Sequence, residues 1–167
     1  EPVENLGYGR AVNLVAEATR SPWLLAANAD TAPEPGALRS LVDAGAADPR
    51  AGALSPRLVL PDGSTQHSVH PFPTLPFLAA FNAGLLGPLG DRFCLEGAWD
   101  PGRARRVPWA VAAFLLLRRA AFRDAGGFDP EQWMYAEDLD LGWRLRGAGW
   151  HTRHVPAAVV RHASGAS

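Results

Sequence analysis

Apolar residues along the chain fall into short continuous runs that are separated by amphipathic segments. Residues 23–27, 53–60 and 109–117 are mainly apolar, which is typical of short strands buried on both faces of a sheet. Residues 11–19 and 37–47 instead repeat their apolar positions at helical spacing, which predicts two helices. Strands and helices therefore alternate along the chain.

The C-terminal third continues this alternation. A helical turn at residues 119–124 is followed by a Gly-Gly turn, and a helix is expected to begin near Asp138. Two short strands are expected at residues 151–155 and 157–162. The whole pattern predicts a single α/β domain with a mixed, mainly parallel sheet flanked by helices.

The middle of the chain is less regular. A turn at residues 61–64 leads into residues 65–69, which are expected to complete a hairpin. Several prolines then precede a hydrophobic segment, residues 77–89, which is expected to hold one short helix. We predict that residues 70–106 form a mobile loop or lid on one side of the domain.

Composition narrows the class of protein. The chain has 167 residues, of which 47% are hydrophobic and 20% charged, as expected for one globular domain. Its net charge of −1 provides no global basic field, so we expect no nucleic-acid partner, although Arg103, Arg105 and Arg106 form a local basic cluster. The single Cys94 fits a reducing compartment, and no secretory signal is expected, so a cytoplasmic location is predicted.

The stretch from residue 126 to residue 150 carries the strongest candidate chemistry. It delivers Glu137, Asp138 and Asp140 to the start of a helix, where the macrodipole stabilises negative charge. One interpretation is a well-capped structural helix. The other is that neighbouring aromatic residues hold a carboxylate at the mouth of a cleft, where it acts as a general base.

Two further positions are candidates for metal or phosphate chemistry. Asn28 and Asp30 directly follow a buried strand, at the edge where open α/β sheets bind ligands. Asp30 could therefore hold a divalent cation, although both residues could equally cap a turn. His162 closes a probable strand and is either a metal ligand or a structural histidine. Trp109, Trp133 and Tyr135 are candidates for a sugar platform or for core residues.

The order of these signals resembles that of family 2 glycosyltransferases, and most closely their bacterial rhamnosyltransferase and galactofuranosyltransferase branch. The resemblance runs over nearly the whole chain, and its most specific block joins the Gly-Gly-Phe-Asp turn to Glu-Asp-x-Asp-Leu. The matching segments are Asn5-Leu6-Gly7-Tyr8-Gly9 with Asn13, Asn28-Ala29-Asp30-Thr31, Trp109, Gly126-Gly127-Phe128-Asp129, Glu137-Asp138-Leu139-Asp140-Leu141 and His162.

This resemblance implies a GT-A fold and an inverting transfer from a nucleotide-diphosphate sugar. Asp138 would be the catalytic base and Glu137 its support, while Asp30 and His162 would hold Mg²⁺ or Mn²⁺ on the donor diphosphate. A single displacement needs one base and one metal site, rather than the two opposed carboxylates of a glycosidase. Asn28 matches the first position of the Asp-x-Asp-type motif.

The resemblance also implies the remaining partners. Asn28, Asp30 and Asn13 would contact the donor, and Trp109, Trp133 and Tyr135 the acceptor, which would be a polysaccharide or lipid-linked glycan. Rhamnose or galactofuranose would be the sugar. Peripheral association with the inner face of the membrane is expected from the habit of the family.

Two departures from the family pattern affect these expectations. Ala112 or Ala113 stands where family members have glycine, which narrows the acceptor pocket. The resemblance also leads us to expect that the chain starts in mid-domain, because nothing in it matches the family's N-terminal nucleotide-binding half. We therefore expect an incomplete GT-A domain that binds donor poorly by itself. The alternatives are a non-catalytic glycan-binding or assembly module and a metal-dependent phosphoester hydrolase.

Overall fold

A computed structural model describes residues 5–85, 102–132 and 135–163. The helices are α1 (Gly7–Ala18), α2 (Ala37–Ala47), α3 (Leu75–Asn82), α5 (Arg119–Asp124) and α6 (Glu137–Gly147). The strands are β1 (Trp23–Ala27), β2 (Thr31–Pro33), β3 (Ala51–Val59), β4 (Val69–His70), β5 (Arg105–Val107), β6 (Trp109–Ala110), β7 (Phe114–Arg118) and β8 (His151–His162).

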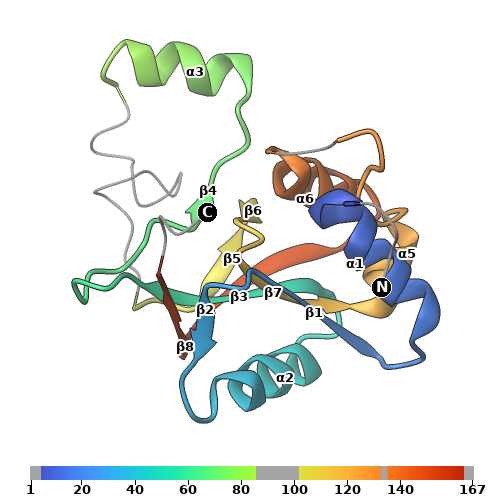
Figure 1. Cartoon of the computed structure of the whole chain (residues 1–167). Helices are drawn as coiled ribbons and strands as arrows, with labels where there is room; N and C mark the ends of the chain where they lie inside the picture. The colour runs from blue at the N-terminus through green and yellow to red at the C-terminus, as the bar shows by residue number, and fades with distance from the viewer. Residues whose placement is uncertain (1–4, 86–101, 133–134, 164–167) are drawn as a thin grey trace.

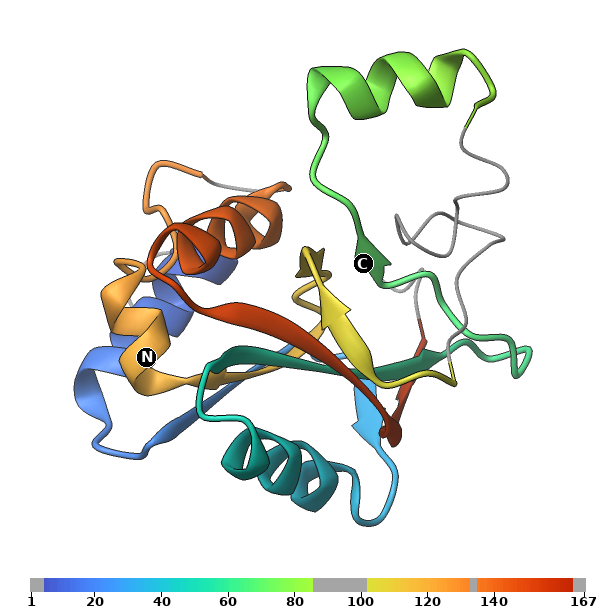
Figure 2. The same ribbon diagram turned by 180° about the vertical axis from the view of Figure 1, so that it is seen from behind.

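The main sheet is mixed, as predicted, and it lies between two layers of helices (Figure 1). Its strand order is β1-β7-β3-β8-β2, and β5 pairs with β8 off this path. The longest ladder, between β3 and β8, is parallel, whereas the other pairings are antiparallel. Figure 2 shows α2 on one face, with α1, α5 and α6 on the other.

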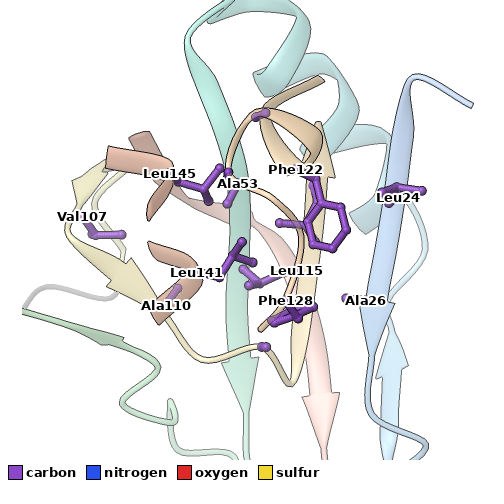
Figure 3. Close-up of a cluster of buried hydrophobic side chains, with 14 of the residues drawn as sticks. Leu24, Ala26, Ala53, Val107, Ala110, Leu115, Phe122, Phe128, Leu141 and Leu145 are labelled. Carbon is purple, nitrogen blue, oxygen red and sulfur yellow. The ribbon is translucent and has the colours of Figure 1, made fainter. Parts of the chain in front are cut away.

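Two buried clusters, one on each face, hold the layers together. On the face covered by α5 and α6, Phe122 and Phe128 pack edge to face with ring centroids 5.6 Å apart (Figure 3). On the opposite face, Leu41 of α2 is fully buried against the sheet. Burying apolar surface on both faces explains why the central strands are apolar runs rather than alternating ones.

Several predicted strands have different limits in the structure. The predicted strand 109–117 is divided into β6 and β7, because residues 111–113 leave the small β4–β6 sheet before β7 joins the main one. The two strands predicted at 151–155 and 157–162 are instead one strand, β8. Its register against β3 shifts between Pro56 and Arg57, which marks an irregularity where the break was expected.

The predicted loop or lid, residues 70–106, contains regular structure in its described part. It includes α3, which lies away from the sheet in both views, and β5, which belongs to the main sheet (Figures 1 and 2). Residues 86–101 of this region lie outside the described residues. The predicted hairpin partner 65–69 makes a single bridge, from Thr65 to Val59, while Val69 pairs with β6.

Candidate active site

Asp138 lies in the first turn of α6, directly after a turn in an unusual backbone conformation. Tyr135 and Ala136 have φ angles of 66° and 63°, a left-handed region that residues with a side chain rarely adopt. The Asp138 carboxylate accepts hydrogen bonds from the backbone N–H of Ala112 at 3.1 Å and of Leu139 at 2.8 Å. Its orientation is therefore fixed from two elements.

Burial raises the pKa of the Asp138 carboxyl above its ordinary value, while the hydrogen bonds from Ala112 and Leu139 lower it by less. The sequence led us to expect that the helix start would favour the ionised form of Asp138. For the net shift of the Asp138 pKa, this expectation was wrong. The reason is that desolvation disfavours the charge more than the nearby amides favour it. A carboxylate with a raised pKa is a stronger base, so the shift suits a proton acceptor.

Tyr8 and Glu137 adjoin Asp138. The Tyr8 hydroxyl donates to the Ala112 carbonyl at 2.6 Å, and burial followed by the negative charges of Glu137 and Asp138 raises the pKa of Tyr8. The Oε2 atom of Glu137 is buried and has no hydrogen-bond partner among the described residues. A buried carboxylate oxygen without a donor is costly, so this atom is suited to receiving a hydrogen bond from a ligand.

Asp30 and His162 meet because β2 pairs with the end of β8. Thr31 lies opposite His162 in this ladder, which places the His162 Nε2 atom 3.3 Å from the Asp30 Oδ1 atom. The other ring nitrogen of His162, Nδ1, lies 2.6 Å from Oε1 of Gln66. His162 is buried and Asp30 is about one-fifth exposed, so the pair lies at the edge of the solvent.

The chemistry of this pair fits a divalent cation. When Nδ1 donates to Gln66, the lone pair of Nε2 faces the Asp30 carboxylate, so two acceptors face each other and need a proton or a cation between them. Within the described ranges, no group of three or more His, Cys, Asp and Glu side chains could hold a metal. The two residues leave positions for diphosphate oxygens, as Mg²⁺ sites on nucleotides commonly do.

Residues 112 and 113, between β6 and β7, connect the two halves of the candidate site. Ala112 contacts Tyr8 and Asp138 through its backbone, and the Ala113 carbonyl accepts the N–H of Asn28 at 2.9 Å. The Asn28 carbonyl in turn accepts both the N–H and the hydroxyl of Thr31. The segment thus places the candidate base beside the turn that carries Asp30.

Asn13 connects α1 with the Gly-Gly-Phe turn. Its side chain donates to the Phe128 carbonyl at 2.8 Å and accepts from the Phe128 N–H at 2.9 Å, so it holds the Gly-Gly-Phe turn. Arg144 holds the same turn through the carbonyls of Ala125 and Gly127, and it also pairs with Asp140. The Asn13 amide keeps one further N–H and one further lone pair, so contact of Asn13 with the donor stays a prediction.

Two of the three candidate aromatic residues, Trp109 and Tyr135, lie among the described residues. Trp109 donates to the Pro71 carbonyl at 2.9 Å and stacks on His70, with ring centroids 4.7 Å apart. Tyr135 is 81% exposed beside the start of α6. Trp133 lies outside the described residues. Tyr8, Gln66 and His70 were missed as site residues, and only Tyr8 had a signal, its position in the quoted Asn-Leu-Gly-Tyr-Gly segment.

Residues 2–167 match the family model described as "Glycosyltransferase like family 2". An N-acetylglucosaminyl-diphospho-decaprenol L-rhamnosyltransferase of Mycobacterium tuberculosis is 39% identical over 173 aligned residues, which cover 95% of this chain. The chain spans 56% of the length of that relative. The rhamnosyltransferase WbbL of Escherichia coli is 41% identical over 56 residues, 34% of this chain and 21% of its own.

A solved structure shares the fold. The crystal structure of GalNAc-T7 with UDP, GalNAc and Mn²⁺ aligns with a TM-score of 0.68 at 15% identity, over 97% of this chain and 31% of its own. At this identity the likeness concerns the fold alone, and it supports the GT-A-like architecture that the sequence predicted.

Proposed function

Because the chain belongs to glycosyltransferase family 2, we propose that it carries the base and metal-binding part of an inverting transferase. The proposed donor is a nucleotide-diphosphate sugar, with rhamnose favoured by the rhamnosyltransferase relatives. The proposed acceptor is a glycan on a lipid carrier. The observation that carries the proposal is the backbone segment Ala112–Ala113, which contacts both the Asp138 carboxylate and the Asn28–Thr31 turn.

In the proposed reaction, Asp138 accepts the proton of an acceptor hydroxyl. The oxygen of that hydroxyl attacks the anomeric carbon of the donor sugar at the same time. The bond from that carbon to the nucleotide diphosphate breaks, and the configuration inverts. Asp30 and His162 would hold Mg²⁺ or Mn²⁺, which when bound neutralises charge on the departing diphosphate. The raised pKa of Asp138 and its fixed orientation both favour proton acceptance.

Neighbouring groups have supporting roles in this proposal. The free Oε2 atom of Glu137 would accept a hydrogen bond from a hydroxyl of the acceptor. Trp109 would line the acceptor side, since its indole is anchored to Pro71 and its ring is stacked on His70. Tyr8 would fix residue Ala112, and through it the Asp138 carboxylate.

The apolar surface of α3 supports a lipid-linked acceptor. Leu75, Phe81 and Leu85, in and just after α3, are 83%, 56% and 66% exposed, and residues 71–85 carry no charged side chain. The mycobacterial relative is named for an acceptor on decaprenol, which is a lipid. Within the described part of the chain, no helix is long and apolar enough to cross a membrane. We therefore propose peripheral contact with lipid rather than insertion by a described helix.

The two alternatives are less well supported. A glycan-binding module has no need of a half-buried carboxylate with a raised pKa together with a histidine–aspartate pair. A two-metal phosphoester hydrolase needs a cluster of acids and histidines, and the described residues contain no group of three.

The first experiment is a calorimetric titration of the protein. UDP and dTDP are the two ligands, and each is tested with and without Mn²⁺. We expect metal-dependent binding of one nucleotide, and we expect the Asp30→Ala variant to lose the metal dependence. Nucleotide affinity that is independent of Mn²⁺ would contradict the metal assignment. A folded protein that binds neither nucleotide would favour the glycan-binding module.

A further inference from the structure

A hollow lies between β5, α6 and β8, outside the candidate active site. Its volume is about 370 Å³, and it is bounded by the segment around β5, the C-terminal half of α6 and the start of β8. The lining side chains that matter here are Phe72, Arg106, Arg146, Trp150 and His151. None of them belongs to the proposed donor, metal or base residues.

Strand β6 separates this hollow from Asp138. Asp138, Gly142 and Arg146 follow one face of α6 at intervals of four residues, so Asp138 and Arg146 are about 12 Å apart along the helix axis. A Cβ atom on Gly142 would meet the Cβ of Trp109 at 2.6 Å, which shows that β6 packs directly on the helix between them. A ligand in the hollow would therefore occupy a separate site.

The hollow carries an excess of positive charge. Arg146 is exposed, and its guanidinium lies 5.6 Å from the centroid of the Phe72 ring. Among the described residues, no acid forms an ion pair with Arg146. Arg106 is 67% exposed and reaches only the Asp48 carboxylate, at 4.0 Å.

The acids around the hollow are already engaged. Asp48 lies 2.9 Å from His151 and 3.2 Å from Arg153. Burial alone would raise the pKa of its carboxyl, but the hydrogen bond and charge of His151, together with the Arg50 N–H and the charge of Arg106, hold that pKa below its ordinary value. Asp124 accepts the indole N–H of Trp150 at 3.2 Å. The guanidinium groups of Arg106 and Arg146 thus keep donors for a ligand, and guanidinium is the side-chain group best matched to phosphate oxygens.

We propose that this hollow binds a phosphate ester of a sugar. The phosphate would lie between Arg106 and Arg146, and the sugar ring would pack on the half-buried ring of Trp150, since Phe72 is only 5% exposed and has Arg146 over its ring. The combination of two arginines with the Trp150 ring selects a ligand with both an anionic group and a ring with apolar C–H faces. This inference goes beyond the proposed function and does not depend on it.

The test uses glucose 1-phosphate as the probe, with EDTA present so that no divalent cation can hold it at the Asp30–His162 pair. Binding to the full-length protein is measured by calorimetry and by the indole N–H signal of Trp150, which is assigned with Trp150→Phe. We expect Arg106→Gln and Arg146→Gln each to weaken binding roughly tenfold or more. Arg39→Gln is the matched control, because Arg39 is an exposed arginine on α2 that pairs with Asp43.

Glucose 1-phosphate bound equally well by Arg106→Gln, Arg146→Gln and the parent would overturn the proposal. Inorganic phosphate that matches the affinity of glucose 1-phosphate would overturn the sugar part, and free glucose that matches it would overturn the phosphate part. Failure of a folded protein to bind the probe would also overturn it. Asp30→Ala should leave this binding unchanged while it alters nucleotide binding, so failures of the two proposals are distinguishable.

Discussion

The Asp138 side chain combines a fixed direction with an unfavourable environment for its charge. Two backbone amides orient the carboxylate, and burial raises its pKa. A purely structural role at this half-buried position would be filled more favourably by a neutral side chain. A carboxylate with a raised pKa is instead typical of a catalytic group. The turn at Tyr135 and Ala136, with φ angles of 66° and 63°, adds local strain next to it.

We predict that Asp138→Asn lowers the transfer rate by about 10²-fold to 10⁴-fold, the usual contribution of a general base. Metal-dependent nucleotide affinity should remain nearly unchanged, because Asp30 and His162 form the separate metal pair. Turnover and calorimetric affinity are measured together. Glu131→Gln is the control, since Glu131 is an exposed acid of the preceding loop. A loss of nucleotide affinity equal to the loss of rate would remove Asp138 from the role of base.

The raised pKa of Asp138 also makes a prediction about pH. The folded carboxyl holds its proton to a higher pH than the unfolded one, so the free energy of unfolding falls as pH rises from the unfolded pKa through the folded pKa. Transfer, which needs the ionised form, should rise over the same window. Asp138→Asn should lack this part of the pH dependence in urea unfolding. Identical pH profiles for the variant and the parent would contradict the shift.

Residue types were predictable from the sequence, whereas their partners were not. Asp30, His162 and Asp138 were selected as candidates because their order resembles that of a known family, and the structure brings Asp30 and His162 together. Gln66 could not be selected, because it lies 96 residues from His162 in the sequence and contacts it only in the folded structure. Asn13 stays a predicted donor contact, but its two hydrogen bonds to Phe128 could not be predicted, since a motif gives position along the chain but not the direction of a side chain.

At the scale of elements, the Gly-Gly-Phe turn is held between two helices. Asn13 of α1 forms two hydrogen bonds with the backbone of Phe128, and Arg144 of α6 bonds to the Gly127 carbonyl at 2.6 Å. Gly126 and Gly127 have φ angles of 82° and 74°, which glycine adopts without strain. The turn thus connects α1 with the helix that carries Asp138.

We predict that Asn13→Ala destabilises the protein by about 1–3 kcal/mol, because it leaves both polar groups of the Phe128 backbone without their partner. Urea unfolding measures this loss. Asn82→Ala is the matched control, since the exposed Asn82 amide makes one hydrogen bond within α3, and it should change stability little. Unchanged stability with weaker nucleotide binding would contradict this structural role and support the predicted contact of Asn13 with the donor.

Strand limits were the least predictable feature of the elements. The run 109–117 is apolar throughout, yet Trp109 pairs with β4 and Leu117 with β1 and β3. Conversely, β8 continues through Pro156, where the sequence indicated a break, since the β3 ladder resumes after a register shift. In both cases the partner strand, not the local sequence, decides where a strand begins and ends.

At the scale of the whole molecule, α3 contributes no buried residue to the core. Its apolar residues do not join either core cluster, and the helix lies away from both helical layers (Figure 1). Exposed apolar residues that gather on one element indicate contact with another apolar surface. Since the proposed acceptor is lipid-linked, we assign this surface to the lipid side of the acceptor.

We predict that Leu75→Ser combined with Leu85→Ser lowers transfer to a lipid-linked acceptor at least several-fold, while transfer to a short water-soluble analogue stays within about twofold. The reason is that both residues, 83% and 66% exposed, contribute apolar surface without supporting the core. Leu38→Ser is the control, because Leu38 is a 42% exposed leucine of α2, on the opposite face of the sheet. Equal losses on both acceptors would mean that α3 supports the active site itself, and no loss on either would separate α3 from acceptor binding.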